Sequence, residues 1–243
     1  MAKLSPDRRW LVALLLGAGL AYAQAVTLTA HVVSVNVGKS SRVHRAGEAV
    51  LWLVPAGTLA APASPENPPA QRPQLIQRNK TFDPHLLVVP VGSVVEFPNR
   101  DPFFHNVFSL FEGKRFDLGL YEAGSTRKVR FDKPGISYIF CDIHPEMSAV
   151  IIALPTPYYG ISDSRGQVVM PNVPPGRYAL HIWYEAALPE QLNAMTREIE
   201  VSPNTSTLGV IRLSAASLQL AHKNKYGQDY DPPTPDNPAY VRP

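Results

Sequence analysis

The chain has 243 residues, of which 45% are apolar and 18% charged, with 25 prolines, one cysteine and a formal net charge of +3. One cysteine excludes a disulfide framework, a cysteine-rich zinc module and a cysteine-bound iron–sulfur cluster, and no apolar run reaches the roughly 18 residues of a membrane-spanning helix. Prolines spread along the chain favour short strands joined by turns. We therefore expect a mostly β protein of one or two domains.

Residues 1–23 have the pattern of a secretory signal peptide. Three basic residues precede an apolar stretch at 10–20 and a small-residue cleavage site at 21–23. Cleavage there would start the mature chain near Gln24 and, by removing three basic residues and one acidic residue, lower the net charge from +3 to +1. We expect a periplasmic or secreted protein with no membrane span after cleavage. No nucleic-acid partner is expected, because the mature chain lacks a basic stripe.

Two segments follow in which apolar and polar residues alternate, the pattern of half-buried strands. They span residues 26–33 and 49–54. Residues 59–73 then contain five prolines in fifteen positions, which predicts a linker or long loop.

A dense series of short apolar runs begins at Gln74, with turn residues between them. Strands are expected at 75–77, 86–89, 94–97, 106–110, 128–131, 136–141 and 148–154. Seven short strands in about eighty residues predict a β-sandwich or barrel. Later strands are expected at 168–170, 178–184, 197–201 and 208–213, and the last thirty residues are expected to lack regular structure.

The residues that carry chemistry lie in two short segments. Cys141, His144 and Met147 have the spacing Cys-x2-His-x2-Met on a tight loop between two expected strands, and His105 begins another strand 36 residues before the cysteine. One thiolate, two imidazoles and one thioether form the donor set of a blue-copper electron-transfer site, with methionine as the long axial ligand. An unpaired cysteine in an exported protein also needs a role. The sequence therefore predicts one type 1 copper ion.

Other cofactors suit these residues less well. Methionine is a poor zinc donor, and the chain has no Cys-x-x-Cys-His segment for haem attachment. It also has no His-x-His pair, which a multicopper oxidase requires, so we expect electron transfer or copper handling and not an enzyme. The remaining histidines have no partner at ligand spacing and are interpreted as structural or solvated: His31, His44, His85, His181 and His222.

Residues 74–155 resemble a small cupredoxin of the amicyanin and plastocyanin type. The resemblance rests on the Cys-x2-His-x2-Met loop, which is similar to that of amicyanin, and on the segments Phe82–Pro84, Val91–Asn99, His105–Val107 and Pro134–Gly135. It implies a Greek-key sandwich with a near-trigonal copper site and an asparagine that ties the two ligand loops together. The implied ligands are His105, Cys141, His144 and, on the axis, Met147, and the implied asparagine is Asn106.

In that family, the edge of the second histidine ligand protrudes through an apolar surface patch. The resemblance therefore implies an exposed edge of His144, bordered by Phe103, Phe104 and Pro145. A redox partner would dock there through a small, transient interface.

The rest of the chain has a likeness of its own. Residues 160–183 resemble the second half of a carboxypeptidase-regulatory-like β-sandwich, and the strands at 26–33 and 49–54 have the pattern of its first half. The whole arrangement resembles exported methylamine-utilization-like proteins. We predict a discontinuous sandwich with an inserted copper domain, the alternative being two domains in series. The predicted parts are 24–58 and 156–213 for the sandwich, 74–155 for the copper domain and 214–243 for an extended tail.

Two functions remain open for the predicted copper site. One is a carrier of single electrons between redox partners such as a periplasmic dehydrogenase or a cytochrome. The other is a copper-binding or copper-delivery protein without an electron-shuttle role. Both use the same ligands, so the reduction potential and the ease of copper loss distinguish them. A relic site is disfavoured because all four ligands are present, and the second sandwich is interpreted as a scaffold or docking module.

Overall fold

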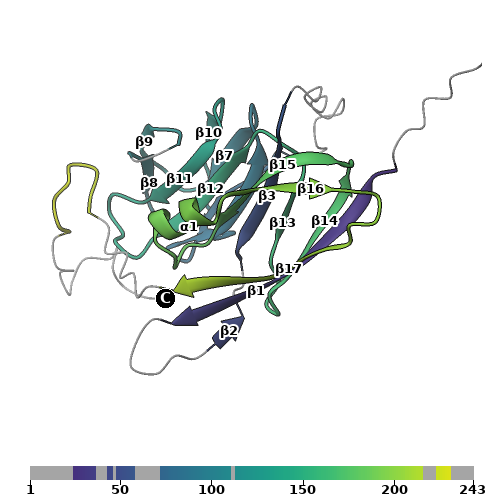
Figure 1. Ribbon diagram of the computed structural model, residues 1–243. Coiled ribbons are helices and arrows are strands. Elements are labelled where there is room, and N and C mark those ends of the chain that lie inside the picture. The colour runs from purple at the N-terminus through teal and green to yellow at the C-terminus, as the bar shows by residue number, and fades with distance from the viewer. Residues whose placement is uncertain are drawn as a thin grey trace, which may run out of the picture.

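The computed structural model describes residues 24–36, 43–45, 48–57, 72–110, 113–215 and 223–230, which form strands and one short helix (Figure 1). The all-β fold class predicted from the sequence is confirmed. The expected signal peptide at 1–23 and all but the end of the expected linker at 59–73 lie outside the described residues. Within those described ranges, no helix is long and apolar enough to cross a membrane.

The outer sandwich combines strands from both ends of the chain. One sheet has the order β14-β1-β17, with β2 paired to β1, and the other has the order β13-β3-β15-β16. Strand β3 pairs antiparallel with β15, from Val50 opposite Trp183 to Pro55 opposite Tyr178. The pairing expected between residues 49–54 and the later strands is therefore present, and β1 likewise pairs with β14 and β17. The elements are β1 (Val26–Asn36), β2 (Val43–Arg45), β3 (Val50–Pro55), β13 (Tyr159–Ile161), β14 (Gln167–Val173), β15 (Gly176–Trp183), α1 (Pro189–Met195), β16 (Arg197–Val201) and β17 (Thr207–Ala215).

Alternation along the strands explains why the two outer sheets pack face to face. Leu28 and Val32 of β1 and Leu51 and Leu53 of β3 are fully buried in one apolar cluster, to which every second residue of these strands contributes. The turn before β14 requires glycine: Gly166 has a φ of +77°, and a Cβ at this position would collide with the carbonyl oxygen of Val32.

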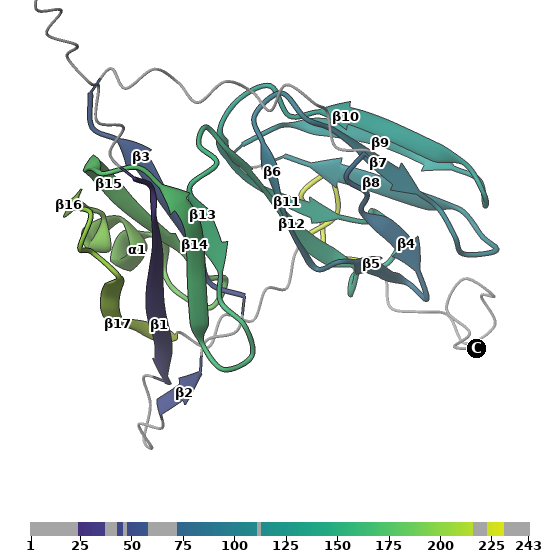
Figure 2. The same ribbon diagram turned by 90° about the vertical axis from the view of Figure 1, so that its right-hand side faces the viewer.

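The inner sandwich is formed by the strands between residues 76 and 154 (Figure 2). Its main sheet has the order β6-β12-β11-β8-β9, and the pairs β7-β10 and β4-β5 lie opposite. A second apolar cluster, which includes Phe97, Phe131 and Ile151, fills the space between them. The strands are β4 (Ile76–Arg78), β5 (Thr81–Asp83), β6 (Leu86–Pro90), β7 (Val94–Pro98), β8 (His105–Ser109), β9 (Phe116–Tyr121), β10 (Thr126–Arg130), β11 (Gly135–Phe140) and β12 (Ser148–Leu154).

The two sandwiches contact each other through β12 and β3. Ile151 of β12 packs in the inner core, whereas its neighbours Val150 and Ile152 join a third apolar cluster together with Val50 and Trp183 of the outer sandwich. Successive residues of a strand point to opposite faces, so β12 is buried on both sides. This double burial explains the nearly unbroken apolar sequence of the strand.

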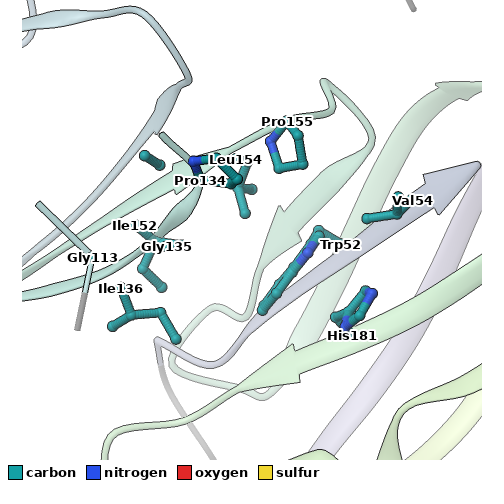
Figure 3. Close-up of a pocket in the computed structure, with 11 residues that line it drawn as sticks. Trp52, Val54, Gly113, Pro134, Gly135, Ile136, Ile152, Leu154, Pro155 and His181 are labelled. Atoms are coloured by element: carbon teal, nitrogen blue, oxygen red, sulfur yellow. The ribbon is translucent and has the colours of Figure 1, made fainter. Parts of the chain in front are cut away.

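A pocket of about 450 Å³ lies at the contact between the sandwiches (Figure 3). Trp52 of β3 and His181 of β15 stack there with ring centroids 5.2 Å apart, and Ile136 and Leu154 of the inner sandwich line the opposite side. Burial lowers the pKa of His181. The stacked, neutral ring fits the structural role expected for this histidine.

The sequence did not predict β2, β5, β9, β13 or α1. Three of these strands have only three residues, too few for an alternating pattern to be recognised. Strand β9 contains Gly119, which has a φ of 65° and interrupts the strand pattern. Strand β17 continues to Ala215, so the tail does not begin at residue 214 as expected.

Candidate metal centre

Strand pairing brings the two predicted ligand segments together. Strands β11 and β12 form a hairpin whose last pair is Phe140 and Ser148, so residues 141–147 are its loop. Strand β8 lies beside β11 in antiparallel orientation, with Phe108 opposite Phe140. Because antiparallel strands run in opposite directions, the start of β8, where His105 lies, reaches the hairpin loop.

His105, Cys141 and His144 form a cluster at this place. Cys141 Sγ lies 3.8 Å from His105 Nδ1 and 3.5 Å from His144 Nδ1, and the three donor atoms lie within 4.8 Å of one another. All three residues have a relative exposure of 0%. Nitrogen and sulfur donors bind a first-row ion such as zinc at about 2.0–2.3 Å. Atoms at these separations can therefore share one ion, and the residues fit a mononuclear metal.

A buried carboxylate orients the ring of His105. Asp101 Oδ2 lies 2.7 Å from His105 Nε2, and the backbone amides of Asn79 and Lys80 donate to the same carboxylate. Burial opposes the ionisation of Asp101, but these hydrogen bonds outweigh it and lower the pKa of the carboxyl group.

The same contact determines which nitrogen of His105 can bind a metal. Burial lowers the pKa of His105 although the hydrogen bond to Asp101 opposes this shift. The neutral ring therefore donates its Nε2–H to the carboxylate and keeps a lone pair on Nδ1, which faces Cys141. A hydrogen bond of this kind on the second nitrogen is common for histidines that bind metals.

Cys141 is held by the main chain of both ligand segments. The backbone amides of Asn106, Ile143 and His144 donate toward its sulfur, yet burial dominates and raises the pKa of the thiol. Without a metal the thiol is therefore protonated at neutral pH, and an incoming ion must displace this proton.

Hydrogen bonds within the hairpin loop give it a closed shape. The amide of Cys141 donates to the carbonyl of Met147, and the amide of Met147 donates to the carbonyl of His144. The Met147 side chain is fully buried in the apolar cluster that also contains Cys141. Met147, the expected axial ligand, therefore shares the apolar core of the inner sandwich with Cys141.

Asn106 connects the two ligand segments through its backbone and not its side chain. Its amide points to Cys141 Sγ, whereas its Nδ2 donates to Asp117 Oδ1 at 2.7 Å. Its buried Oδ1 has no hydrogen-bond partner among the described residues. Asn106 therefore links the two ligand segments as the resemblance implied, but it does so through its backbone amide.

The expectation of an exposed edge on His144 is wrong, because this residue has no exposed surface. The half-buried ring of Phe103 lies against both imidazoles, with ring centroids 5.2 Å from His105 and 5.7 Å from His144. Phe104 is 56% exposed and Pro145 is also exposed. Two of the three residues expected at a docking surface, Phe104 and Pro145, therefore face solvent. The imidazole ring of His144, which was expected to be exposed there, is buried.

Sequence reasoning missed the carboxylates that support the cluster. Asp101 precedes His105 by four residues, and this spacing within one short loop could have suggested the contact. Asp117 accepts from Asn106 across the β8-β9 pair, and no local pattern marks it. The contact of Asp117 with Asn106 exists only because β8 and β9 pair.

Two residues of the C-terminal segment were also missed. The hydroxyl of Tyr230 donates to the carbonyl of Cys141 at 2.7 Å, and the amide of Lys225 donates to Asp142 Oδ1 at 2.9 Å. The sequence predicted an extended tail without regular structure here and gave no indication of its role. Nothing in its polar composition distinguishes these two residues from their neighbours.

The other described histidines do not join the cluster. His85 Nε2 lies 2.8 Å from Glu185 Oε2 of the outer sandwich, and its Nδ1 lies 3.2 Å from the carbonyl oxygen of Ser148. The hydrogen bond that His85 donates to Glu185 raises the pKa of His85 against the effect of burial. The side chains of His44 and His222 lie outside the described residues.

No protein-family model and no curated protein matches the chain. A purple cupredoxin from Nitrosopumilus maritimus is 24% identical over 34% of this chain and 99% of its own length, with a TM-score of 0.32. A copper-containing nitrite reductase from Thermus scotoductus is 26% identical over 42% of this chain and 28% of its own length, with a TM-score of 0.34. A mutant of amicyanin in the Cu(I) state is 17% identical over 34% of this chain and 82% of its own length, with a TM-score of 0.33. Each of these similarities covers less than half of this chain.

Proposed function

We propose that the cluster binds one type 1 copper ion and that the protein carries single electrons. The observation that carries this proposal is the donor set: one buried thiol and two imidazole Nδ1 atoms, all within 4.8 Å of one another. Magnesium and calcium prefer oxygen donors, and structural zinc sites are closed by four cysteine or histidine ligands. A thiolate with two imidazoles and a weak axial thioether, here from Met147, is the set typical of blue copper.

The protein's own contribution is to hold the donors in place. When bound, copper would supply one-electron chemistry between Cu(II) and Cu(I). Asp101 fixes the ring of His105, and the closed hairpin loop fixes Cys141 and His144. Burial of all three residues excludes water from the cluster. Ligands that are fixed before the metal arrives rearrange little between two oxidation states.

The direct test is the optical spectrum of the copper-loaded protein. A thiolate bonded to Cu(II) gives an intense charge-transfer band, and Cys141→Ser should abolish it because an alcohol oxygen cannot replace the soft sulfur donor. The matched control is Met147→Leu, which should keep the colour and raise the reduction potential. A colourless protein that holds stoichiometric zinc after exposure to copper would refute the proposal.

Electron exchange should proceed through the aromatic residues that precede β8. Phe103 contacts both imidazole rings, and the neighbouring Phe104 is 56% exposed. Phe104→Glu should slow electron self-exchange between Cu(I) and Cu(II) copies at low salt, because two like charges then meet in the encounter complex. Val169→Glu, at a 53% exposed position of the outer sandwich, is the control. Equal rates for both variants, measured by NMR line broadening, would place the exchange surface elsewhere.

Copper binding or delivery without an electron-shuttle role is the second candidate. The burial of His144 favours it, because no exposed imidazole edge is available to a redox partner. The two functions differ in the fate of the ion. A delivery protein loses Cu(I) to a chelator within the time of mixing and lacks a reversible potential, whereas an electron carrier keeps the ion through repeated oxidation and reduction.

We further propose an exported protein whose redox partners are of the dehydrogenase or cytochrome class. The signal-peptide pattern at 1–23 supports export. For the outer sandwich we propose a scaffold role, supported by its large apolar core. Export is tested by determining the N-terminus of the mature protein by mass spectrometry. A mature N-terminus far from Gln24 would contradict the predicted signal-peptide cleavage site.

A further inference from the structure

The C-terminal strap, defined here as residues 223–230, reaches the metal centre from the outer sandwich. It follows β17, which belongs to the outer sheet β14-β1-β17. Figure 1 shows it in yellow on the side of the molecule where β8 and β9 lie. Its contacts with the inner sandwich are made at the hairpin loop and at β9. A segment that follows the last outer strand therefore contacts the inner sandwich at the hairpin loop of the candidate metal centre.

The strap has a defined shape of its own. Asn224 donates its amide to the carbonyl of Gln228, and Gly227 donates its amide to the carbonyl of Asn224. Asn224 Oδ1 accepts from the amides of Tyr226 and Gln228 at 3.0 and 2.9 Å. Gly227 has a φ of +77°, which a residue with a side chain adopts only with strain. This turn presents Lys225 toward the inner sandwich.

Lys225 binds the hairpin loop directly and the segment of His105 indirectly, through Asp117. Its amide donates to Asp142 Oδ1 at 2.9 Å in the hairpin loop, and its Nζ donates to Asp117 Oδ2 at 3.0 Å on β9. Asp117 in turn accepts from Asn106, the residue after His105. The hydrogen bond to Asp117 raises the pKa of Lys225 and keeps it charged.

Tyr230 binds the backbone of the cysteine itself. Its hydroxyl donates to the carbonyl of Cys141 at 2.7 Å, while the amide of Cys141 donates to Met147. Both polar groups of the Cys141 main chain are therefore engaged, one by the loop and the other by the strap. A buried carbonyl that loses its donor favours loop conformations in which water reaches it.

We propose that Lys225 and Tyr230 are positioning residues of the metal centre, which hold the hairpin loop in its ligand-binding conformation before a metal is bound. This inference rests on the proposed function for its relevance to copper, but its central claim concerns the metal-free protein. Without the strap, the loop would open more often, expose Cys141 and release a bound ion more readily.

The metal-free protein offers a direct readout, because Cys141 is the sole cysteine and is fully buried. Iodoacetamide can modify it only when the loop opens. In the full chain, Tyr230→Phe should increase the alkylation rate about threefold to tenfold, the effect of losing one hydrogen bond. Tyr226→Phe, a 73% exposed position in the same strap, should react like the parent protein. The thermal midpoint should stay close to that of the parent in both.

A second pair of variants tests the lysine. Lys225→Met removes the Nζ contact with Asp117 but keeps the amide, so it should increase alkylation less than Tyr230→Phe does, and Lys225→Arg should restore the parent rate. Lys223→Met is the control, because Lys223 is 60% exposed and pairs with Asp229 at 3.9 Å. Parent-like alkylation in both Tyr230→Phe and Lys225→Met, or increases that a lower thermal midpoint fully explains, would overturn the proposal.

Copper provides a separate readout. In the loaded protein, Tyr230→Phe should shift the charge-transfer band or the potential and speed copper transfer to a Cu(I) chelator about threefold to tenfold. If no copper binds but Tyr230→Phe still increases alkylation of Cys141, the proposed function is wrong and the positioning role of the strap is supported. If copper binds but Tyr230→Phe changes neither the alkylation of Cys141 nor the release of copper, the positioning role of the strap is wrong and the proposed function is unaffected.

Discussion

The two sandwiches use similar strands but differ in what their interiors hold. Within the described residues, the outer sandwich has an apolar core and three buried polar side chains, Ser34, Thr156 and Ser162. The inner sandwich buries a larger set of polar and ionisable side chains, which includes His105 and His144 of the candidate metal centre: Gln77, Lys80, Asn99, Asp101, His105, Asn106, Ser109, Ser137 and His144. Buried polar groups are costly unless each finds a partner. Buried polar and ionisable side chains are therefore concentrated in the inner sandwich.

The contrast between the sandwiches does not make them independent. They share the apolar cluster that contains Val50, Ile152 and Trp183, and the His85–Glu185 pair lies between them. The strap follows the last outer strand in sequence and contacts the hairpin loop. A site in one unit is thus supported by the other, and each of the following experiments separates the two contributions.

Cutting the chain should give the largest effect. Strands β1 and β3 are interior strands of the two outer sheets, so residues 156–215 alone should be unfolded, whereas residues 74–155 alone should fold and bind copper. Exposure of Val150 and Ile152 should make the isolated inner sandwich self-associate. Circular dichroism and sedimentation test both pieces. A folded spectrum for residues 156–215 would show that the outer sandwich does not need its first strands.

Two adjacent isoleucines of β12 should destabilise different parts of the molecule. Ile151→Ala empties space in the inner core, and Ile152→Ala empties space between the sandwiches. Each should cost about 2–5 kcal/mol of unfolding free energy. Hydrogen exchange should show faster opening of the inner strands in the first variant and of β3 and β15 in the second. The same exchange pattern in both variants would mean that the sandwiches unfold as one unit.

Asp101→Asn should weaken the inner sandwich of the metal-free protein. The carboxylate accepts two backbone amides and the Nε2–H of His105, and hydrogen bonds to a charged acceptor contribute about 1.5–3 kcal/mol. Asp163→Asn is the matched control, since this carboxylate accepts two amides in an exposed outer turn. Urea unfolding should show the larger loss for Asp101. An equal loss in both variants would contradict a special role for the buried carboxylate.

The smallest expected effect is a pH-dependent one between the sandwiches. Glu185 raises the pKa of His85 above its ordinary value of 6.5. A raised pKa in the folded state stabilises the protein fully below about pH 6.5 and loses this contribution as pH rises through the folded value. The stability difference between the parent and His85→Gln should therefore shrink from pH 6 to pH 8. Glu185→Gln should remove the same dependence, and a difference that grows with pH would refute it.

Much of the molecule follows from local sequence. The predicted ligands Cys141, His144 and Met147 lie on one hairpin loop, so their spacing alone places them in one short segment. Alternating residues at 26–33 and 49–54 had no place in the inner sandwich, and this surplus indicated a sandwich built from both ends of the chain, a pairing that is observed in β1 and β3. These features can be predicted from the sequence because the first depends on residues that are neighbours in the chain. The second depends only on the number of predicted strands, which exceeds what the inner sandwich needs.

Other features depend on which surfaces meet, and no local pattern encodes that. The resemblance implied an exposed His144, but its ring is covered. The polar tail gave no sign that Tyr230 would reach the carbonyl of Cys141, 89 residues earlier in the chain. By itself the sequence determined the ligand types, the strand periodicity and the all-β class, because these are set by residue chemistry over short spans. Only the tertiary structure decided the burial of the ligands and the role of the strap, because both require the packing of segments that are distant in sequence.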